Sequence, residues 1–173
     1  MSLTAAMRGV RGNMIGMAIG ELHRSEHRLG SVLVALSDHQ KAEHEIFHVA
    51  RDIAAWSDEH VRKLAAAGQQ YDLDLDPEPG RPSALLAAVR RTSSEALGRF
   101  STPGLLLLAE LRRVHRLAAG VSLDWELLAQ SAQAVKDSDL LALAQDCHPQ
   151  TLRQLRWANA KLKEVSPQAM TAG

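Results

Sequence analysis

Apolar residues recur every three or four positions along most of this chain, which is the spacing of the buried face of an amphipathic helix. The longest repeat follows Thr102 and Pro103, two residue types that favour the N-cap and the first position of a helix. Stretches rich in proline, glycine and aspartate separate the repeats. The pattern predicts helices near residues 13–37, 39–68, 83–98, 103–136 and 138–164.

The same spacing predicts which side of each long helix faces a core. In the first two helices the predicted core positions are Ile15, Ile19, Leu22, Leu29, Leu33 and Leu36, followed by Ile46, Ala50, Ile53, Ser57, His60 and Leu64. In the last two they are Leu107, Leu111, Val114, Ala118, Val121, Trp125, Leu128, Ala132 and Val135, followed by Leu152, Leu155 and Leu162. Stripes of this kind are typical of helices that pack side by side in a bundle.

The connections predict how the helices are joined. We expect Ser37 and Asp38 to cap the second helix and Asp137 to begin the turn before the last one, so that each pair of helices forms an antiparallel hairpin. Residues 69–82 have the composition of an acidic, proline-rich linker. Pro149 is expected to kink or restart the last helix.

These elements predict one all-α domain over residues 1–173, with frayed tails at 1–12 and 166–173. The predicted architecture is a four-helix bundle with a crossover connection that contains the short extra helix. Composition agrees, because the chain holds 27 Ala and 26 Leu against six aromatic residues, and Ala and Leu favour helices most strongly.

The charge balance and the single cysteine narrow the kinds of partner and the cellular compartment that we expect. Twenty basic residues balance twenty acidic ones, which argues against a nucleic-acid partner. One cysteine excludes an internal disulfide, and Cys147 is expected to pack in the core. The apolar run at 14–20 is too short for a membrane span and has no cleavage site after it. We therefore expect a cytoplasmic protein with no membrane partner.

Residues 47–65 form an apolar helical segment with an acidic residue and a histidine near its end. In this segment and in its overall layout the chain resembles the ferritin-like superfamily, in particular small bacterial ferritin-like domains of unassigned function. Where that family has a di-metal site, two helices each supply a Glu and the other two each supply a Glu-x-x-His, all pointing inward. Glu45 and His48 form the one Glu-x-x-His in this chain, and their positions on the helix predict that they face outward.

Ionisable side chains also fall on or beside the predicted core faces. An unpaired buried charge is strongly unfavourable, so we expect these groups to bind a metal, namely iron, manganese or zinc, or to bond to one another. In the metal-free alternative Glu26 bonds to Asn159, and the histidines pair or take water. Their depths along the helices allow three separate polar layers as well as one site. The candidate metal ligands are Glu26, Glu43, His60, Glu110 and His148.

Three functions follow from this pattern: a ferritin-like bundle that binds a metal with no assigned reaction, a metal-free helical module that binds a protein partner, and a diiron-type oxidase or hydroxylase. We also expect homo-oligomers, because Gly12, Gly16 and Gly20 form a small-residue stripe and one helix cannot bury all four leucines of 105–108 on a single side. The remaining histidines on polar faces are expected to be solvated, and they include His23, His27, His44 and His48.

Overall fold

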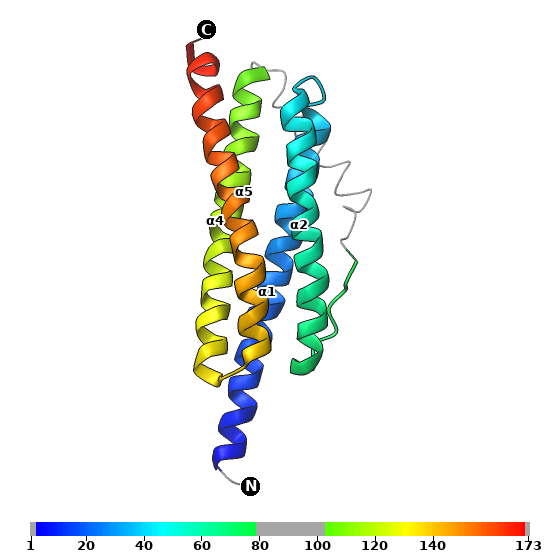
Figure 1. The fold of residues 1–173 in the computed structure, drawn as a ribbon, viewed down its shortest axis with the longest axis vertical. Helices are drawn as coiled ribbons and strands as arrows, with labels where there is room; N and C mark the ends of the chain where they lie inside the picture. Colours follow the sequence, from blue (N-terminus) through cyan, green and yellow to red (C-terminus); the bar gives the residue numbers. More distant parts are fainter. Residues whose placement is uncertain (1–2, 79–102, 172–173) are drawn as a thin grey trace.

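Four long α-helices dominate the computed structural model, which describes residues 3–78 and 103–171, with the backbone alone for 3–13. The helices are α1 (Leu3–His39), α2 (His44–Gly68), α4 (Pro103–Val135) and α5 (Ser138–Thr171), and a 3-10 turn, η1 (Gln69–Tyr71), follows α2 (Figure 1). The described residues include no strand, so the all-α prediction is confirmed for them. The predicted helix at 83–98 lies outside these residues.

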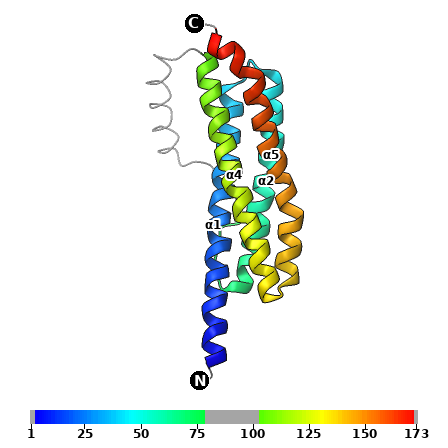
Figure 2. The ribbon, with the colours of Figure 1, turned by 90° about the vertical axis from the view of Figure 1, so that its left-hand side faces the viewer.

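The helices form two antiparallel hairpins, α1 with α2 and α4 with α5 (Figures 1 and 2). At one end of the molecule His39, the last residue of α1, contacts Glu110 near the start of α4. At the other end Tyr71, just after α2, donates a hydrogen bond to Asp137, just before α5 (Oη–Oδ2 2.5 Å). α2 and α4 therefore run in the same direction. We refer to the four packed helices as the bundle.

One hydrophobic core runs between the four helices. The predicted core positions on α1 and α2 are all buried, and so are those on α4 from Leu107 to Ala132. Val135 is the exception, because it lies in the last turn of α4 and is 39% exposed. Cys147 is fully buried, as expected. Long apolar repeats thus located the buried faces of these three helices.

The predicted buried face of α5 is wrong. Leu152, Leu155 and Leu162 are only half-buried, and the helix turns a different stripe toward the core. Because small and polar residues fill that stripe, the larger leucines on its flanks misled the assignment. α5 also continues through Pro149 without a break. The buried residues of α5 are Leu140, Ala144, Cys147, Thr151, Gln154, Ala158 and Lys161.

The hairpin turns differ in how closely they follow the sequence prediction. Ser37 and Asp38 do not cap α2, because α1 continues through both of them. Ser37 Oγ instead donates to the backbone oxygen of Phe47 (2.7 Å), and Asp38 pairs with Arg51 (2.6 Å), so both side chains fasten α1 to α2. Asp137 does cap α5, since its carboxylate accepts a hydrogen bond from the backbone N–H of Leu140 (2.9 Å).

The first part of the predicted linker, residues 72–78, lies along the bundle in irregular structure. Leu73 packs close to two glycines: a Cβ at Gly68 would lie 3.3 Å from Leu73 Cβ, and a Cβ at Gly16 would lie 3.7 Å from Leu73 Cδ2. Gly16 therefore faces residues 71–73 of its own chain, at a distance that leaves room for an ordinary van der Waals contact. His23 is buried here, with Nε2 2.9 Å from the backbone oxygen of Asp76, so the prediction that it is solvated is wrong.

The helix ends extend past their predicted limits. α1 begins at Leu3 rather than near residue 13, and α5 ends at Thr171 rather than near 164. None of the described helices combines the length and apolar content that crossing a lipid bilayer requires.

Candidate functional site

A carboxylate and an imidazole meet in the middle of the bundle. Glu26 stands on the buried face of α1 between Leu22 and Leu29, and His60 stands on the buried face of α2. Glu26 Oε1 lies 2.7 Å from His60 Nδ1, and the two side chains are 0% and 1% exposed. The periodicity that placed both residues in the core was therefore correct, and the two groups bond to each other.

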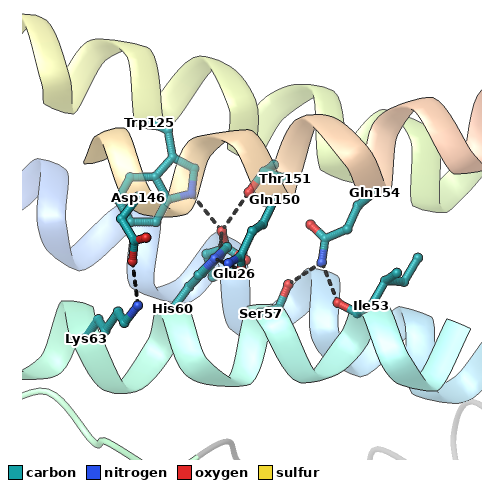
Figure 3. A network of polar contacts seen from close by, with 10 residues as sticks. All are labelled: Glu26, Ile53, Ser57, His60, Lys63, Trp125, Asp146, Gln150, Thr151 and Gln154. Carbon is teal, nitrogen blue, oxygen red and sulfur yellow. Dashed lines mark hydrogen bonds and ion pairs between the residues drawn. The ribbon is translucent and has the colours of Figure 1, made fainter. Parts of the chain in front are cut away.

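The same carboxylate oxygen also binds the other two helices (Figure 3). From α4, the indole Nε1–H of Trp125 donates to Glu26 Oε1 over 2.7 Å. From α5, the Thr151 hydroxyl donates to the same atom over 3.2 Å. One oxygen of Glu26 thus receives hydrogen bonds from all three neighbouring helices.

The second nitrogen of His60 is also bonded. Nε2 lies 3.0 Å from Gln150 Oε1, an amide oxygen that can only accept. With a carboxylate at Nδ1 and an amide oxygen at Nε2, both ring nitrogens donate, which requires the charged imidazolium. Burial lowers the pKa of His60, but hydrogen bonds to Cys147 and Glu26 outweigh it and raise that pKa to about 10. We call Glu26, His60, Trp125, Gln150 and Thr151 the buried polar cluster.

A second polar layer lies one turn along α5. The Gln154 amide nitrogen donates to the backbone oxygen of Ile53 (2.7 Å) and to Ser57 Oγ (3.0 Å), which ties α5 to α2. Lys63 and Asp146 form an ion pair of 2.7 Å at the rim of the cluster, where both side chains meet solvent (Figure 3). α2 and α5 make fewer contacts with each other than the two hairpins make internally.

The other predicted ligands lie elsewhere. Glu43 is exposed at the N-cap position of α2. Glu110 is half-buried near the end of the bundle, where it contacts His39 and Gln40. His148 is 19% exposed and lies 2.8 Å from the Ser122 hydroxyl. Of the five candidates, the structure brings together only Glu26 and His60.

The predicted bond between Glu26 and Asn159 is wrong. Asn159 is exposed, because α5 is rotated relative to the prediction and turns Thr151 and Gln154 inward instead. Glu45 and His48 face outward, as expected. His44 is also exposed, and its ring stacks edge-on against His48 with centroids 4.3 Å apart.

The donor atoms of the buried polar cluster do not fit a di-metal centre. Such a centre draws carboxylates from four helices and uses an imidazole lone pair, whereas the cluster holds one carboxylate and an imidazole that donates from both nitrogens. Three hydrogen-bond donors occupy Glu26 Oε1. Within residues 3–78 and 103–171, no three His, Cys, Asp or Glu side chains are grouped so that they could hold a metal ion.

The sequence analysis missed Gln150 and Thr151 of the buried polar cluster and Gln154 of the second polar layer, and it placed Trp125 in the core without a polar role. A signal for the α5 residues was present: positions 140, 144, 147, 151, 154, 158 and 161 alternate steps of four and three without interruption. That stripe contains few large apolar residues, so a count of leucines favours its neighbour.

Comparisons of the chain with protein-family models, with curated proteins and with solved structures found no match.

Proposed function

We propose that this chain is a ferritin-like bundle that works as a metal-free protein-interaction module and associates with itself. Two antiparallel hairpins in which the second and third long helices run in the same direction support the ferritin-like assignment, since one-crossover bundles have that order. The buried polar cluster supports a structural role for the core, because Glu26 Oε1 accepts hydrogen bonds from side chains of the three other helices. Glu26 Oε2 is buried beside it with no hydrogen-bond partner among the described residues.

The cluster fixes how the helices sit relative to one another. A shift of any helix along its axis would separate Glu26, His60, Trp125 or Thr151 from its partner and leave a polar group unpaired in the core. Buried polar groups are best documented in this use, as devices that select one helix register at some cost in stability. The result is a rigid bundle that presents its outer helix faces in a constant arrangement.

Large apolar side chains exposed on those outer faces carry the proposal of self-association. On α4, Leu123 and Leu127 stand one turn apart and are 60% and 65% exposed. On α1, which packs beside α4, Met14 and Met17 are 68% and 67% exposed. Some of the features that first motivated self-association are used within the chain, because Leu107 and Leu108 are buried and Gly16 packs against residues 71–73, whereas Leu105 stays 41% exposed.

Molecular mass in solution tests the proposal. We expect the wild-type chain to sediment as a dimer or larger species at tens of micromolar, and the double variant Leu123→Glu, Leu127→Glu to sediment as a monomer with its helical signal unchanged. The matched control is Gln145→Glu with Asn159→Glu, which adds the same two charges at exposed positions of α5 and should keep the wild-type mass. A monomeric wild type, or leucine and control variants of equal mass, would contradict self-association.

The metal-binding alternative has a separate test. If Glu26 and His60 held iron, manganese or zinc, adding that ion would raise the melting temperature, because a ligand that binds only the folded state stabilises it. We expect no such rise with Fe(II), Mn(II) or Zn(II), and no stoichiometric metal in the purified protein. A rise that His60→Gln abolishes would overturn the metal-free assignment.

A further inference from the structure

A groove runs between the first turns of α4 and the last turns of α5. It has a volume of about 470 Å³, and its lining includes Leu105, Leu108, Leu162 and Met170. Leu108 is almost fully buried, whereas Leu105 and Met170 are 41% and 71% exposed. Large apolar side chains thus form both the floor and the outer edge of the groove.

α4 and α5 approach each other closely at one end of this groove. Gly104 of α4 lies so close to α5 that a Cβ at this position would stand 3.0 Å from Ala169 Cβ. The two helices are therefore already in contact at this end of the groove, which limits how far they can move together there.

Positive charge lines the groove. Arg112 and Lys163 are part of its lining, and Arg116 lies one turn further along α4 in an adjoining hollow that shares Ala109 and Arg112. All three side chains are exposed, and none forms a hydrogen bond or an ion pair within the part of the chain that the structure describes. Arg112 and Arg116 are also four residues apart on one helix, a like-charge spacing that weakens the helix slightly.

The acidic residues closest in sequence to Arg112 and Lys163 bind other side chains. Glu110 contacts His39 and Gln40 on α1. Glu164 pairs with Lys161, on the core side of α5. The groove consequently combines an apolar floor with uncompensated positive charge at its rim.

We propose that this groove binds an acidic amphipathic α-helix of a protein partner, an inference that rests on the proposed role as an interaction module. An apolar groove between helices accepts the apolar face of a third helix, whose residues at i, i+4 and i+7 fill it. Asp or Glu residues beside that face would meet Arg112, Arg116 and Lys163. Residues 79–102 of this chain have the wrong charge for the role, since they contain four arginines and one glutamate.

A synthetic peptide tests the proposal on the full chain. The probe is a helical peptide of about 18 residues, or five turns, with leucines on one face and glutamates on the flanks. Fluorescence anisotropy should detect binding to the wild type. We expect binding to weaken at least about tenfold when lysines replace the glutamates, and to weaken with added salt because the charged contacts lie at the surface.

Two protein variants locate the binding. Arg112→Glu with Arg116→Glu should weaken the peptide's affinity at least about tenfold. Arg28→Glu with Lys136→Glu makes the same charge change at exposed sites on α1 and on the α4–α5 turn, and it should leave the affinity unchanged. Equal losses in the two variants, or equal affinity for the acidic and basic peptides, would overturn the proposal. Binding of anionic phospholipid vesicles without binding of the peptide would overturn it in favour of a lipid surface.

The outcome is distinguishable from that of the self-association experiment. A monomeric chain that binds the acidic peptide at Arg112 and Arg116 would contradict self-association and support the groove. An oligomer that binds no peptide would contradict the groove and leave self-association in place. Melting curves of all four variants, which should match the wild type within a few degrees, exclude unfolding as the cause of any loss.

Discussion

Two histidine–carboxylate pairs join α1 to its neighbours, and they differ in almost everything except their chemistry. In the buried polar cluster, His60 and Glu26 are 1% and 0% exposed, and each makes further hydrogen bonds. At the end of the bundle, His39 and Glu110 are 46% and 26% exposed, and water reaches both. The same two functional groups therefore sit in a dry environment and in a wet one.

The difference predicts how each pair responds to loss of one partner. In the dry pair, the remaining charge cannot be hydrated, so removing either group leaves an uncompensated charge in the core. In the wet pair, water replaces the missing partner, and ion pairs at such sites contribute little. Losing one member of the buried pair should therefore destabilise the protein more than losing both, whereas losing one member of the exposed pair should change the stability little.

The largest expected effect is that of Glu26→Leu. This change leaves the His60 imidazolium without its counter-charge and the Trp125 N–H without an acceptor, so we expect a loss of about 3–5 kcal/mol in the free energy of unfolding. Denaturant titration followed by circular dichroism measures it. Glu26→Gln keeps an acceptor oxygen at the site and should cost less, which provides a folded variant if the leucine variant is too unstable to study. Equal stability of Glu26→Leu and wild type would show that the pair does not form.

The second-largest expected effect is the stability that the protein regains when both Glu26 and His60 are replaced. The double variant Glu26→Leu, His60→Leu contains neither charge, so it should be more stable than Glu26→Leu alone by about 1–3 kcal/mol, even though Trp125 remains unpaired. A double-mutant cycle measures this coupling. Additive losses would mean that the two residues act independently.

The third effect is a pH dependence that follows from the raised pKa of His60. Its pKa is about 10 in the folded chain against an ordinary value of 6.5, so the folded state binds the extra proton. The pair's stabilisation is therefore complete below about pH 6.5 and declines as the pH rises through about 10, by at most about 1.4 kcal/mol per pH unit for one proton. Unfolding free energies between pH 6.5 and 10 should show this slope in the wild type and a shallower one in His60→Gln. Identical slopes would contradict the assignment.

The smallest expected effect is that of Glu110→Leu, which makes at the exposed pair the change that Glu26→Leu makes at the buried one. We expect a loss below about 1 kcal/mol, because solvent hydrates His39 once its partner is gone. Thermal and denaturant melts compare the two variants directly. A loss as large as that of Glu26→Leu would show that burial does not separate the two pairs.

The sequence predicted the parts of this molecule in which buried positions are large and apolar. On α1, α2 and α4, leucine, isoleucine and valine mark the core face clearly enough that Glu26 and His60 stand out as polar interruptions. Prediction failed on α5, where the core positions are Thr151, Gln154 and Ala158 and the leucines flank them. A helix whose inward side chains are small, or bond to polar groups of its neighbours, shows only a weak hydrophobic periodicity in its sequence.

The sequence also could not predict contacts that do not follow the periodicity of a helix. His23 lies off the core stripe of α1, and it is buried because residues 72–78 fold back over it. The spacing of residues along a helix contains no information about which loop will cover its polar side. For the same reason the sequence placed five candidate ligands at plausible depths but could not show which neighbours would meet them.

Cys147 is a built-in probe of local opening of the bundle. It is the chain's one cysteine, it is fully buried, and its thiol contacts His60. A thiol reagent can reach it only when α5 separates from the other helices, so the rate of modification counts opening events of this region under native conditions. The modification rate of Cys147 thus measures how often the region around the buried polar cluster opens, without an introduced label. The same sample also gives the rate of global unfolding for comparison.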